Sequence, residues 1–263
     1  MLTLELEDFD IAQIAESGQC FRMYRVTDDT WELFALNRFL KVRKKEGTHI
    51  FYCDQKEFND FWFNYFDSQT DYGEIKKRIL ATNDEYLIEA VKFGSGLRIL
   101  RQDLWEVMVS FIISQQNNIP RIKNCLKKLC DINEGKFPTP DDFLNFREAD
   151  LDSVKLGYRK NYLLKISEAI SDGNFDLEKL RKMNYSEAMK YLKTLYGVGD
   201  KVANCIALFG MHQIEAFPID VWIKRILETR YCNDFSLERW GLQGVGGIVQ
   251  QYMFFYERRL KLQ

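Results

Sequence analysis

Residues 192–208 read Leu-Lys-Thr-Leu-Tyr-Gly-Val-Gly-Asp-Lys-Val-Ala-Asn-Cys-Ile-Ala-Leu, and residues 217–220 read Phe-Pro-Ile-Asp. Apolar residues fall at helical spacing on both sides of Gly197-Val198-Gly199, which predicts two helices joined by a sharp turn at about 190–211. Two glycines two positions apart let the backbone turn tightly and bring its N–H groups against a bulky ligand. Because the second helix begins near Asp200, its free N–H groups and the positive end of its dipole point to the same place. The stretch therefore predicts a helical hairpin that binds a phosphate.

The backbone N–H groups of Gly197, Gly199 and Val202 are expected to hold this phosphate. Lys201 lies in the first turn of the same helix. Asp220 follows nineteen residues later, where it is placed to cap a further helix. An amine and a carboxylate beside a phosphate site indicate chemistry on nucleic acid.

Lys201 and Asp220 are the candidate catalytic residues. Burial and a helix N-terminus both disfavour an ammonium ion, so Lys201 is expected to act as a neutral nucleophile. Hydrogen bonds at an N-cap favour a carboxylate, so Asp220 is expected to stay ionised and to offset positive charge that develops on a sugar. A phosphate-contacting surface lysine and a plain helix cap are the structural alternatives for these two positions.

Four groups of residues along the chain carry a resemblance to a known family. Besides the hairpin they are Gly18-Gln19-Cys20-Phe21-Arg22, then Leu100-Arg101-Gln102-Asp103 with Ser110-Phe111-Ile112 and Asn117-Asn118-Ile119, and finally Gly157-Tyr158-Arg159. In this order they resemble the 8-oxoguanine DNA glycosylases of the helix-hairpin-helix superfamily of base excision repair. The resemblance implies a bifunctional DNA glycosylase and lyase, in which Lys201 displaces 8-oxoguanine, forms a Schiff base with the opened sugar and permits strand cleavage by β-elimination.

The resemblance also assigns the residues that bind the damaged base, which must leave the DNA stack before C1′ can be attacked. It places the backbone carbonyl of Gly18 against N7–H of 8-oxoguanine, where guanine has a repelling lone pair. Cys205 and Phe254 match the residues that sandwich the base, and Gln250 matches the amide that binds its Watson–Crick edge. A turn glycine, a core cysteine and an ordinary amphipathic helix are the alternatives for these positions.

A second group of residues is implied to hold the gap and the orphaned cytosine. Arg121 and Arg159 match the two arginines that address the cytosine, and Tyr158 matches the aromatic wedge. Gln116 occupies the gap-filling position, where the family has asparagine, so a weaker preference for opposite cytosine is expected. Trp222 stands where eukaryotic relatives tend to have a phosphate-binding histidine, and no role is assigned to it.

The expected fold class is α+β: a small antiparallel sheet domain at residues 1–90, packed on a larger all-helical glycosylase region of two subdomains at residues 91–263. Alternating aromatic and polar residues between about 20 and 66 predict short strands. The apolar run 60–66 either closes this sheet or starts a helix. Helical spacing dominates from Tyr72 onward. Breaks are expected at Gly94-Ser95-Gly96, at Phe137–Pro140 and at Gly173-Asn174.

Composition limits the cofactors and the compartment. The chain has 263 residues, six scattered cysteines and two histidines. The cysteines show no paired spacing, so no metal and no other cofactor is expected. The cysteines are expected to be reduced thiols. No apolar run reaches the ~20 residues of a membrane span, and the start shows no signal segment. We therefore expect a soluble monomer without membrane contact, in the cytoplasm (nucleoid) of a prokaryote or the nucleus of a eukaryote.

The formal net charge of −2 disfavours a protein that coats DNA regardless of sequence. Basic residues nevertheless cluster at 121–128 and 155–165, as expected for an enzyme that scans DNA and releases it. Two other functions are open: a superfamily glycosylase with broader specificity for damaged bases, and a non-catalytic protein that uses the hairpin to hold the DNA backbone. The latter explains the hairpin glycines but not Lys201 together with Asp220.

Overall fold

The N-terminal strands form one antiparallel sheet in the order β1-β5-β4-β3-β2 in the computed structural model, which describes residues 1–260. The strands are β1 (Leu2–Leu4), β2 (Met23–Arg25), β3 (Thr30–Ala35), β4 (Arg38–Lys45) and β5 (Thr48–Phe51). Successive side chains of a strand point to opposite faces of the sheet, and so Trp31, Leu33 and Ala35 of β3 all lie in the core. The expected sheet is confirmed, and β1 adds an edge strand that the sequence did not indicate.

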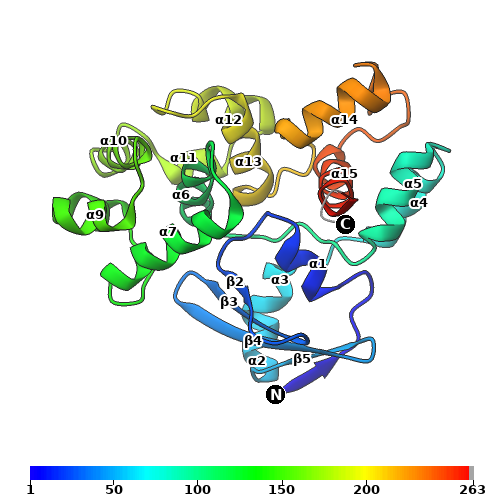
Figure 1. The fold of residues 1–263 in the computed structure, drawn as a ribbon, viewed down its shortest axis with the longest axis horizontal. Helices are drawn as coiled ribbons and strands as arrows, with labels where there is room; N and C mark the ends of the chain where they lie inside the picture. The colour runs from blue at the N-terminus through cyan, green and yellow to red at the C-terminus, as the bar shows by residue number, and fades with distance from the viewer. Residues whose placement is uncertain (261–263) are drawn as a thin grey trace.

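Short helical segments complete the core of the sheet. They are α1 (Ile11–Glu16), α2 (Gln55–Glu57), the π-helical turn η1 (Phe58–Trp62) and α3 (Phe63–Tyr65). The apolar run 60–66 is thus helical up to Tyr65, and its Trp62 and Phe66 are fully buried in the core of the sheet. Helix α1 lies between the sheet and the C-terminal helix (Figure 1).

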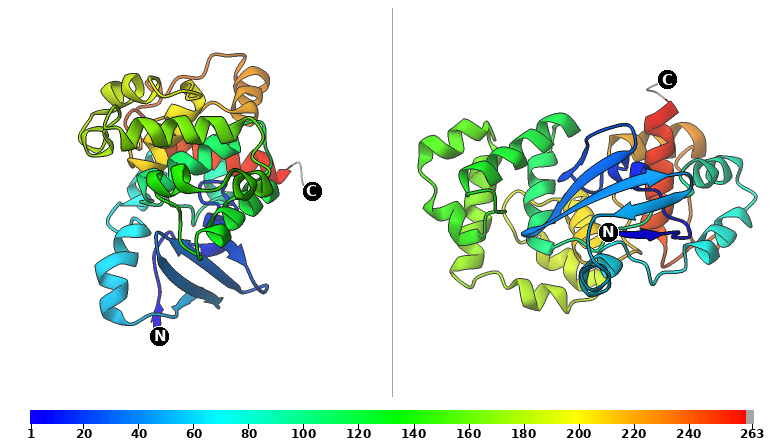
Figure 2. Two further views of the ribbon diagram at one scale, coloured as in Figure 1. Left: turned by 90° about the vertical axis from the view of Figure 1, so that its left-hand side faces the viewer. Right: turned by 90° about the horizontal axis from the view of Figure 1, so that it is seen from below.

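The rest of the described chain is helical, as the spacing predicts. Its helices are α4 (Tyr72–Leu80), α5 (Glu85–Phe93), α6 (Leu104–Ser114), α7 (Ile119–Ile132), α8 (Pro140–Asn145), α9 (Glu148–Val154), α10 (Arg159–Ser171), α11 (Leu177–Arg181), α12 (Tyr185–Leu192), α13 (Asp200–Gly210), α14 (Val221–Tyr231) and α15 (Gly246–Leu260). The expected breaks fall between helices: Gly94 ends α5, Pro140 begins α8, and Gly173 follows α10. The α+β fold class is confirmed, with the sheet at one end of the molecule (Figure 2).

Within residues 1–260 the buried apolar side chains form two clusters. The smaller one belongs to the sheet and the helical segment that follows it. The larger one runs through the helices and includes Ile79 of α4 and Leu87 of α5. Helix α5 packs along α15, so α4 and α5 contribute to the helical core, although α4 precedes the expected boundary at residue 90 and α5 crosses it. No helix in this part of the chain is long and apolar enough to cross a bilayer.

A buried ion pair joins the sheet to the helices. Nη1 of Arg22, just before β2, lies 2.9 Å from Oε2 of Glu106 on α6, and both side chains are more than nine-tenths buried. The same oxygen accepts the N–H of Leu36 at 3.2 Å. Burial raises the pKa of Glu106 to about 7, although Arg22 acts in the opposite direction. The pair fixes segment 18–22 against α6, the helix on which α13 packs.

Candidate active site

Helices α12 and α13 form the predicted hairpin, joined by residues 193–199. Gly197 has a φ of +85°, which favours glycine, and a Cβ there would lie 2.5 Å from the ring of Tyr162. Gly199 is the N-cap of α13, no side chain of the described residues caps this helix, and Gly199 is exposed. The first N–H groups of α13 therefore have no partner within the helix and open to solvent, an arrangement that suits a phosphate.

A cavity of about 910 Å³ lies beside the hairpin. Its walls come from the Gly18 turn, the end of α6, the starts of α13 and α14, and one face of α15. The predicted site residues that line it are Gly18, Gln116, Gly199, Lys201, Val202, Cys205, Asp220, Gln250 and Phe254. The predicted site residues that do not line the cavity are Gly197, Arg121, Tyr158 and Arg159. The fold thus brings the predicted catalytic and base-binding residues to one place.

Lys201 and Asp220 face this cavity from the starts of two different helices. Asp220 caps α14, because its Oδ1 accepts the N–H groups of Trp222 at 3.0 Å and Ile223 at 2.9 Å. The Nζ of Lys201 lies 5.2 Å from the centre of the Phe111 ring. The hydrogen bonds of the cap were expected to lower the pKa of Asp220, but burial raises it. The two N–H donors and Lys201 offset only part of that rise.

The predicted base-binding residues Gly18 and Phe254 are in contact in the cavity wall. Gly18 has a φ of +77°, and a Cβ there would lie 3.1 Å from Cε1 of Phe254, so both the conformation and the close approach favour glycine. Cys205 lies one turn after Lys201 on α13 and is buried. Burial raises the pKa of the Cys205 thiol to about 11, so the thiol is protonated at neutral pH.

Helix α15 supplies a charged residue that the sequence analysis missed. Gln250 lies one turn before Phe254, is 3% exposed, and its Oε1 accepts Nε2 of Gln251 at 3.2 Å. Arg258 lies one turn after Phe254 and also lines the cavity. Its guanidinium lies 5.5 Å from the centre of the Phe254 ring, and its Nη1 donates to the carbonyl of Glu16 at 3.1 Å. Arg258 could have been predicted from the sequence, because a residue one helical turn after Phe254 lies on the same face of the helix.

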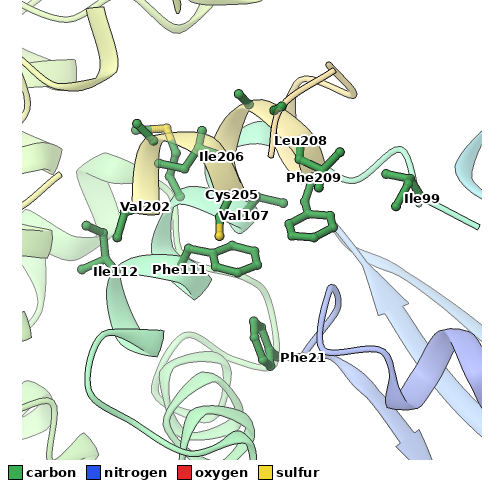
Figure 3. Packing of buried hydrophobic residues seen from close by; sticks show 14 of the residues in the cluster. Phe21, Ile99, Val107, Phe111, Ile112, Val202, Cys205, Ile206, Leu208 and Phe209 are labelled. Atoms are coloured by element: carbon green, nitrogen blue, oxygen red, sulfur yellow. The ribbon is translucent and has the colours of Figure 1, made fainter. Parts of the chain in front are cut away.

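Aromatic side chains that were not predicted form another part of the wall. Phe111 of α6 stacks on Phe209 of α13 with ring centres 5.3 Å apart, and Phe21 meets Phe111 edge-on at 5.6 Å. Figure 3 shows these three rings, with Cys205 on the side of α13 that faces Phe111. Trp222 lines the cavity as well. Phe21 belongs to the Gly-Gln-Cys-Phe-Arg segment and could have been inferred from it.

Of the residues predicted to hold the gap, Gln116 lies on the turn before α7, Arg121 in the first turn of α7, and Tyr158 and Arg159 at the start of α10. Gln116 is exposed and has a φ of +47°. Arg121 is also exposed, and its Nη2 donates to the carbonyl of Lys155 at 3.2 Å. The ring of Tyr158 is 45% exposed, whereas Arg159 is only 4% exposed. Gln116, Arg121 and Tyr158 are therefore exposed to solvent, whereas Arg159 is buried.

The donors of Arg159 are bonded to the main chain. Its Nε donates to the carbonyl of Gln115 at 2.8 Å, and Nη2 donates to the carbonyls of Gln115 and, at 3.0 Å, Gln116. Its Nη1 donates to the carbonyl of Leu156 at 3.2 Å. A buried guanidinium needs such partners, because an unpaired buried charge is costly. Arg159 thus meets the main chain through Nε, Nη1 and Nη2, whereas Arg121 does so through Nη2.

Comparison with known proteins covers both the sheet and the helices. Residues 1–108 match the family model of the 8-oxoguanine DNA glycosylase N-terminal domain, and residues 109–234 match that of the HhH-GPD superfamily base excision DNA repair proteins. The N-glycosylase/DNA lyase of Saccharomyces cerevisiae is 30% identical over 270 residues, covering 88% of this chain and 70% of the yeast protein. That of Arabidopsis thaliana is 33% identical over 162 residues, covering 56% of this chain and 44% of the plant protein.

A solved structure extends the likeness over the whole fold. It is the 8-oxoguanine glycosylase/lyase of Clostridium acetobutylicum in complex with double-stranded DNA containing cytosine opposite 8-oxoguanine. The two structures are similar with a TM-score of 0.87 at 36% identity, covering 97% of this chain and 93% of the clostridial chain. Because sequence and fold agree from the sheet to the hairpin, the chain belongs to the 8-oxoguanine DNA glycosylase family of the helix-hairpin-helix superfamily.

Proposed function

We propose that this protein is a bifunctional DNA glycosylase and lyase that removes 8-oxoguanine from double-stranded DNA in base excision repair. The observation that carries the proposal is the meeting of Lys201 and Asp220 with Cys205 and Phe254 in one cavity beside the hairpin. A volume of about 910 Å³ leaves room for a base turned out of the duplex. Family membership and the DNA-bound clostridial relative support the same activity.

Lys201 is the proposed nucleophile. Its amine forms a bond to C1′ of the deoxyribose while the bond from C1′ to N9 breaks, and the electron pair of that bond leaves with the base, which takes up a proton. The sugar ring then opens to a Schiff base between Lys201 and C1′. This imine acidifies the C2′ proton, and its loss expels the phosphate at C3′, so that the strand is cut by β-elimination.

Asp220 is proposed to stabilise the positive charge that develops on the sugar as the base leaves. Two main-chain N–H groups hold its carboxylate in place, so little reorganisation is needed during the reaction. Because burial raises its pKa, the carboxylate is lost at a higher pH than in an exposed aspartate as the solution is acidified.

The base is proposed to enter between Cys205 and Phe254. There the Gly18 carbonyl would accept N7–H of 8-oxoguanine, and Gln250 would bind the Watson–Crick edge. The contact between Gly18 and Phe254 supports this assignment, because it places the reading carbonyl beside the stacking ring. The neutral thiol of Cys205 offers a polarisable surface rather than a charge.

DNA backbone and orphaned cytosine would be held outside the cavity. The N–H groups of Gly197, Gly199 and Val202 are proposed to bind a phosphate near the lesion. Arg121 is the proposed reader of the cytosine, since its guanidinium is exposed, while Gln116 fills the gap and Tyr158 wedges the duplex. Arg159 is proposed as the second arginine that addresses the cytosine, as the resemblance implies.

One chain supplies every residue proposed for catalysis and base binding, so we propose that the protein acts as a monomer. A DNA substrate places it with the chromosome, in the cytoplasm (nucleoid) of a prokaryote or the nucleus of a eukaryote.

Borohydride trapping on a duplex carrying 8-oxoguanine opposite cytosine tests the proposal. We expect a covalent adduct with the wild type, and none with Lys201→Gln or with undamaged duplex. Base release without an adduct would indicate a monofunctional enzyme. Equal trapping on other damaged bases would indicate broader specificity, and binding without either reaction would indicate a non-catalytic protein.

A further inference from the structure

We propose that Arg258 is a catalytic residue of base release, whose guanidinium stabilises the negative charge that develops on the departing base. The inference rests on the proposed function and deepens it. Lys201 and Asp220 are proposed to act on the sugar, which is one side of the bond that breaks, and Arg258 acts on the other side.

Arg258 is one of five charged residues in the described lining of the cavity. Two of the others, Asp200 and Lys224, are exposed and form ion pairs with residues that do not line the cavity. The remaining three, Lys201, Asp220 and Arg258, are partly buried. Because Lys201 has to be neutral to act as a nucleophile, Arg258 is the lasting cation of these three.

Within residues 1–260, no carboxylate forms an ion pair with Arg258. The carboxylate of Glu16 pairs with Nη2 of Arg259, whereas Nη1 of Arg258 donates to the main-chain carbonyl of Glu16 at 3.1 Å. The Nε and Nη2 atoms of Arg258 donate to no residue of the same described range. A guanidinium carries five N–H donors, so Arg258 retains several of them for a ligand in the cavity.

The guanidinium keeps its charge in this partly buried place. Burial and the neighbouring Arg259 lower the pKa of Arg258, whereas Glu16 and Asp220 raise it. A guanidinium nevertheless stays protonated in proteins at neutral pH. Its field is only weakly screened in the cavity, because protein surrounds much of the side chain.

Arg258 lies where the damaged base is proposed to bind. Its Nη1 would lie 3.5 Å from a Cβ on Gly18, and its guanidinium lies 5.5 Å from the centre of the Phe254 ring. The Gly18 carbonyl is proposed to accept N7–H of 8-oxoguanine, and the carbonyl oxygens O6 and O8 of that purine flank N7. The donors of Arg258 are therefore next to the turn that binds the oxygen-bearing edge of the base.

Departure of the base sends negative charge to this edge. As the bond from C1′ to N9 breaks, its electron pair moves onto the purine and is delocalised over the ring, O6 and O8, until the base takes up a proton. A guanidinium stabilises such an oxygen through charge-assisted hydrogen bonds that strengthen as the charge grows. The Asp220 carboxylate and the Arg258 guanidinium thus place opposite charges beside the sugar that becomes positive and the base that becomes negative.

Two reactions separate this role from a general one. They are single-turnover release of 8-oxoguanine and cleavage of a duplex that already contains an abasic site, both at saturating enzyme. No base leaves in the second reaction, so loss of the guanidinium should slow only the first. We expect Arg258→Gln to slow base release on the order of a hundredfold and to leave abasic-site cleavage within about twofold. Equal slowing of both reactions would indicate a phosphate contact and overturn the proposal.

Arg258→Lys separates charge from positioning. Lysine keeps the positive charge, so we expect it to recover at least roughly tenfold of the rate that Arg258→Gln loses. The second readout is the ratio of affinities for guanine duplex and for 8-oxoguanine duplex whose 2′-fluoro sugar resists cleavage. Arg258→Gln should leave this ratio within about threefold, because the charge develops only as the bond breaks. Loss of the ratio would show that Arg258 merely positions Gly18, and would overturn the catalytic role.

Lys224→Gln is the matched control, because it removes the same charge from an exposed residue of the same lining. We expect wild-type rates of base release and abasic-site cleavage. If it slows base release as much as Arg258→Gln, the effect belongs to the overall field of the cavity and the proposal fails. A wild-type rate of base release in Arg258→Gln would likewise overturn it, whereas absence of base release by the wild type would refute the proposed function itself.

Discussion

Gly18 and Phe254 lie near opposite ends of the chain, yet a Cβ on Gly18 would come within 3.1 Å of Cε1 of Phe254. Two further bonds join the same elements: Arg258 donates to the carbonyl of Glu16, and Arg259 pairs with the Glu16 carboxylate. The proposed base site is thus formed by two segments whose spacing these contacts fix. Its width depends on the absence of a side chain at residue 18.

Gly18→Ala should slow release of 8-oxoguanine by at least roughly tenfold. The new Cβ must displace the Phe254 ring, and a φ of +77° costs an L-residue about 1–2 kcal/mol. Single-turnover base release and affinity for abasic-site DNA are the two measurements, and the affinity should stay within about twofold. Gly47→Ala is the matched control, because Gly47 has a φ of +84° but its Cβ would meet no atom of the described chain within 4 Å. If both variants release the base equally fast, the contact does not define the base site.

Lys201→Gln should abolish both base release and borohydride trapping while leaving affinity for lesion DNA largely intact. The amine is needed for bond formation, whereas the hairpin N–H groups that are proposed to hold the phosphate are unchanged. Lys224→Gln is a suitable control, since Lys224 also lines the cavity but lies on α14 beyond the capping turn. Near wild-type cleavage by Lys201→Gln would refute the assigned nucleophile.

The parts of the site that could be predicted are those encoded locally. Glycine spacing and helical periodicity indicated the hairpin, and an aspartate before an apolar helix indicated the cap at residue 220. The pKa of Asp220 could not be predicted, because its direction depends on burial by the assembled cavity. The bonding of Arg159 likewise depends on where α10 meets the turn after α6, a contact that no local pattern encodes. The sequence did not predict strand β1, because this strand is short and pairs with the distant β5.

Gly199→Val should weaken binding to lesion and undamaged DNA alike, by roughly tenfold, without lowering protein stability. Its φ of −97° is open to any residue, and a Cβ would meet no described atom within 4 Å, so the side chain would point into the space proposed for the phosphate. Phosphate contacts carry no sequence information, which is why both DNAs should be affected. By contrast, Gly197→Ala should destabilise the fold, because its Cβ would lie 2.5 Å from the Tyr162 ring. Loss of binding confined to lesion DNA would show that the loop reads the base.

His49 should make the protein less stable in mild acid. It is 2% exposed, both ring nitrogens lack hydrogen-bond partners among the described residues, and burial lowers its pKa from 6.5 to about 4. The unfolded chain therefore binds more protons between these values, so the stability is present above pH 6.5 and is lost as the pH falls toward 4. At pH 5 the loss should be about 2 kcal/mol. Urea unfolding at pH 7 and pH 5 measures it, and His49→Phe should reduce the difference; an unchanged difference would assign it to other groups.

Arg121→Ala should flatten discrimination among the bases opposite 8-oxoguanine. Arg121 is the exposed arginine at the gap, and loss of a bidentate base contact costs on the order of 1–3 kcal/mol, so release opposite cytosine should slow most. Gln116→Asn should act in the opposite sense, because the shorter amide restores the family's side chain at the gap and should sharpen the preference for cytosine. Cleavage of four duplexes that differ only in the opposite base measures both effects. If Arg121→Ala slows all four equally, Arg121 contacts phosphate or protein and does not read the orphaned base.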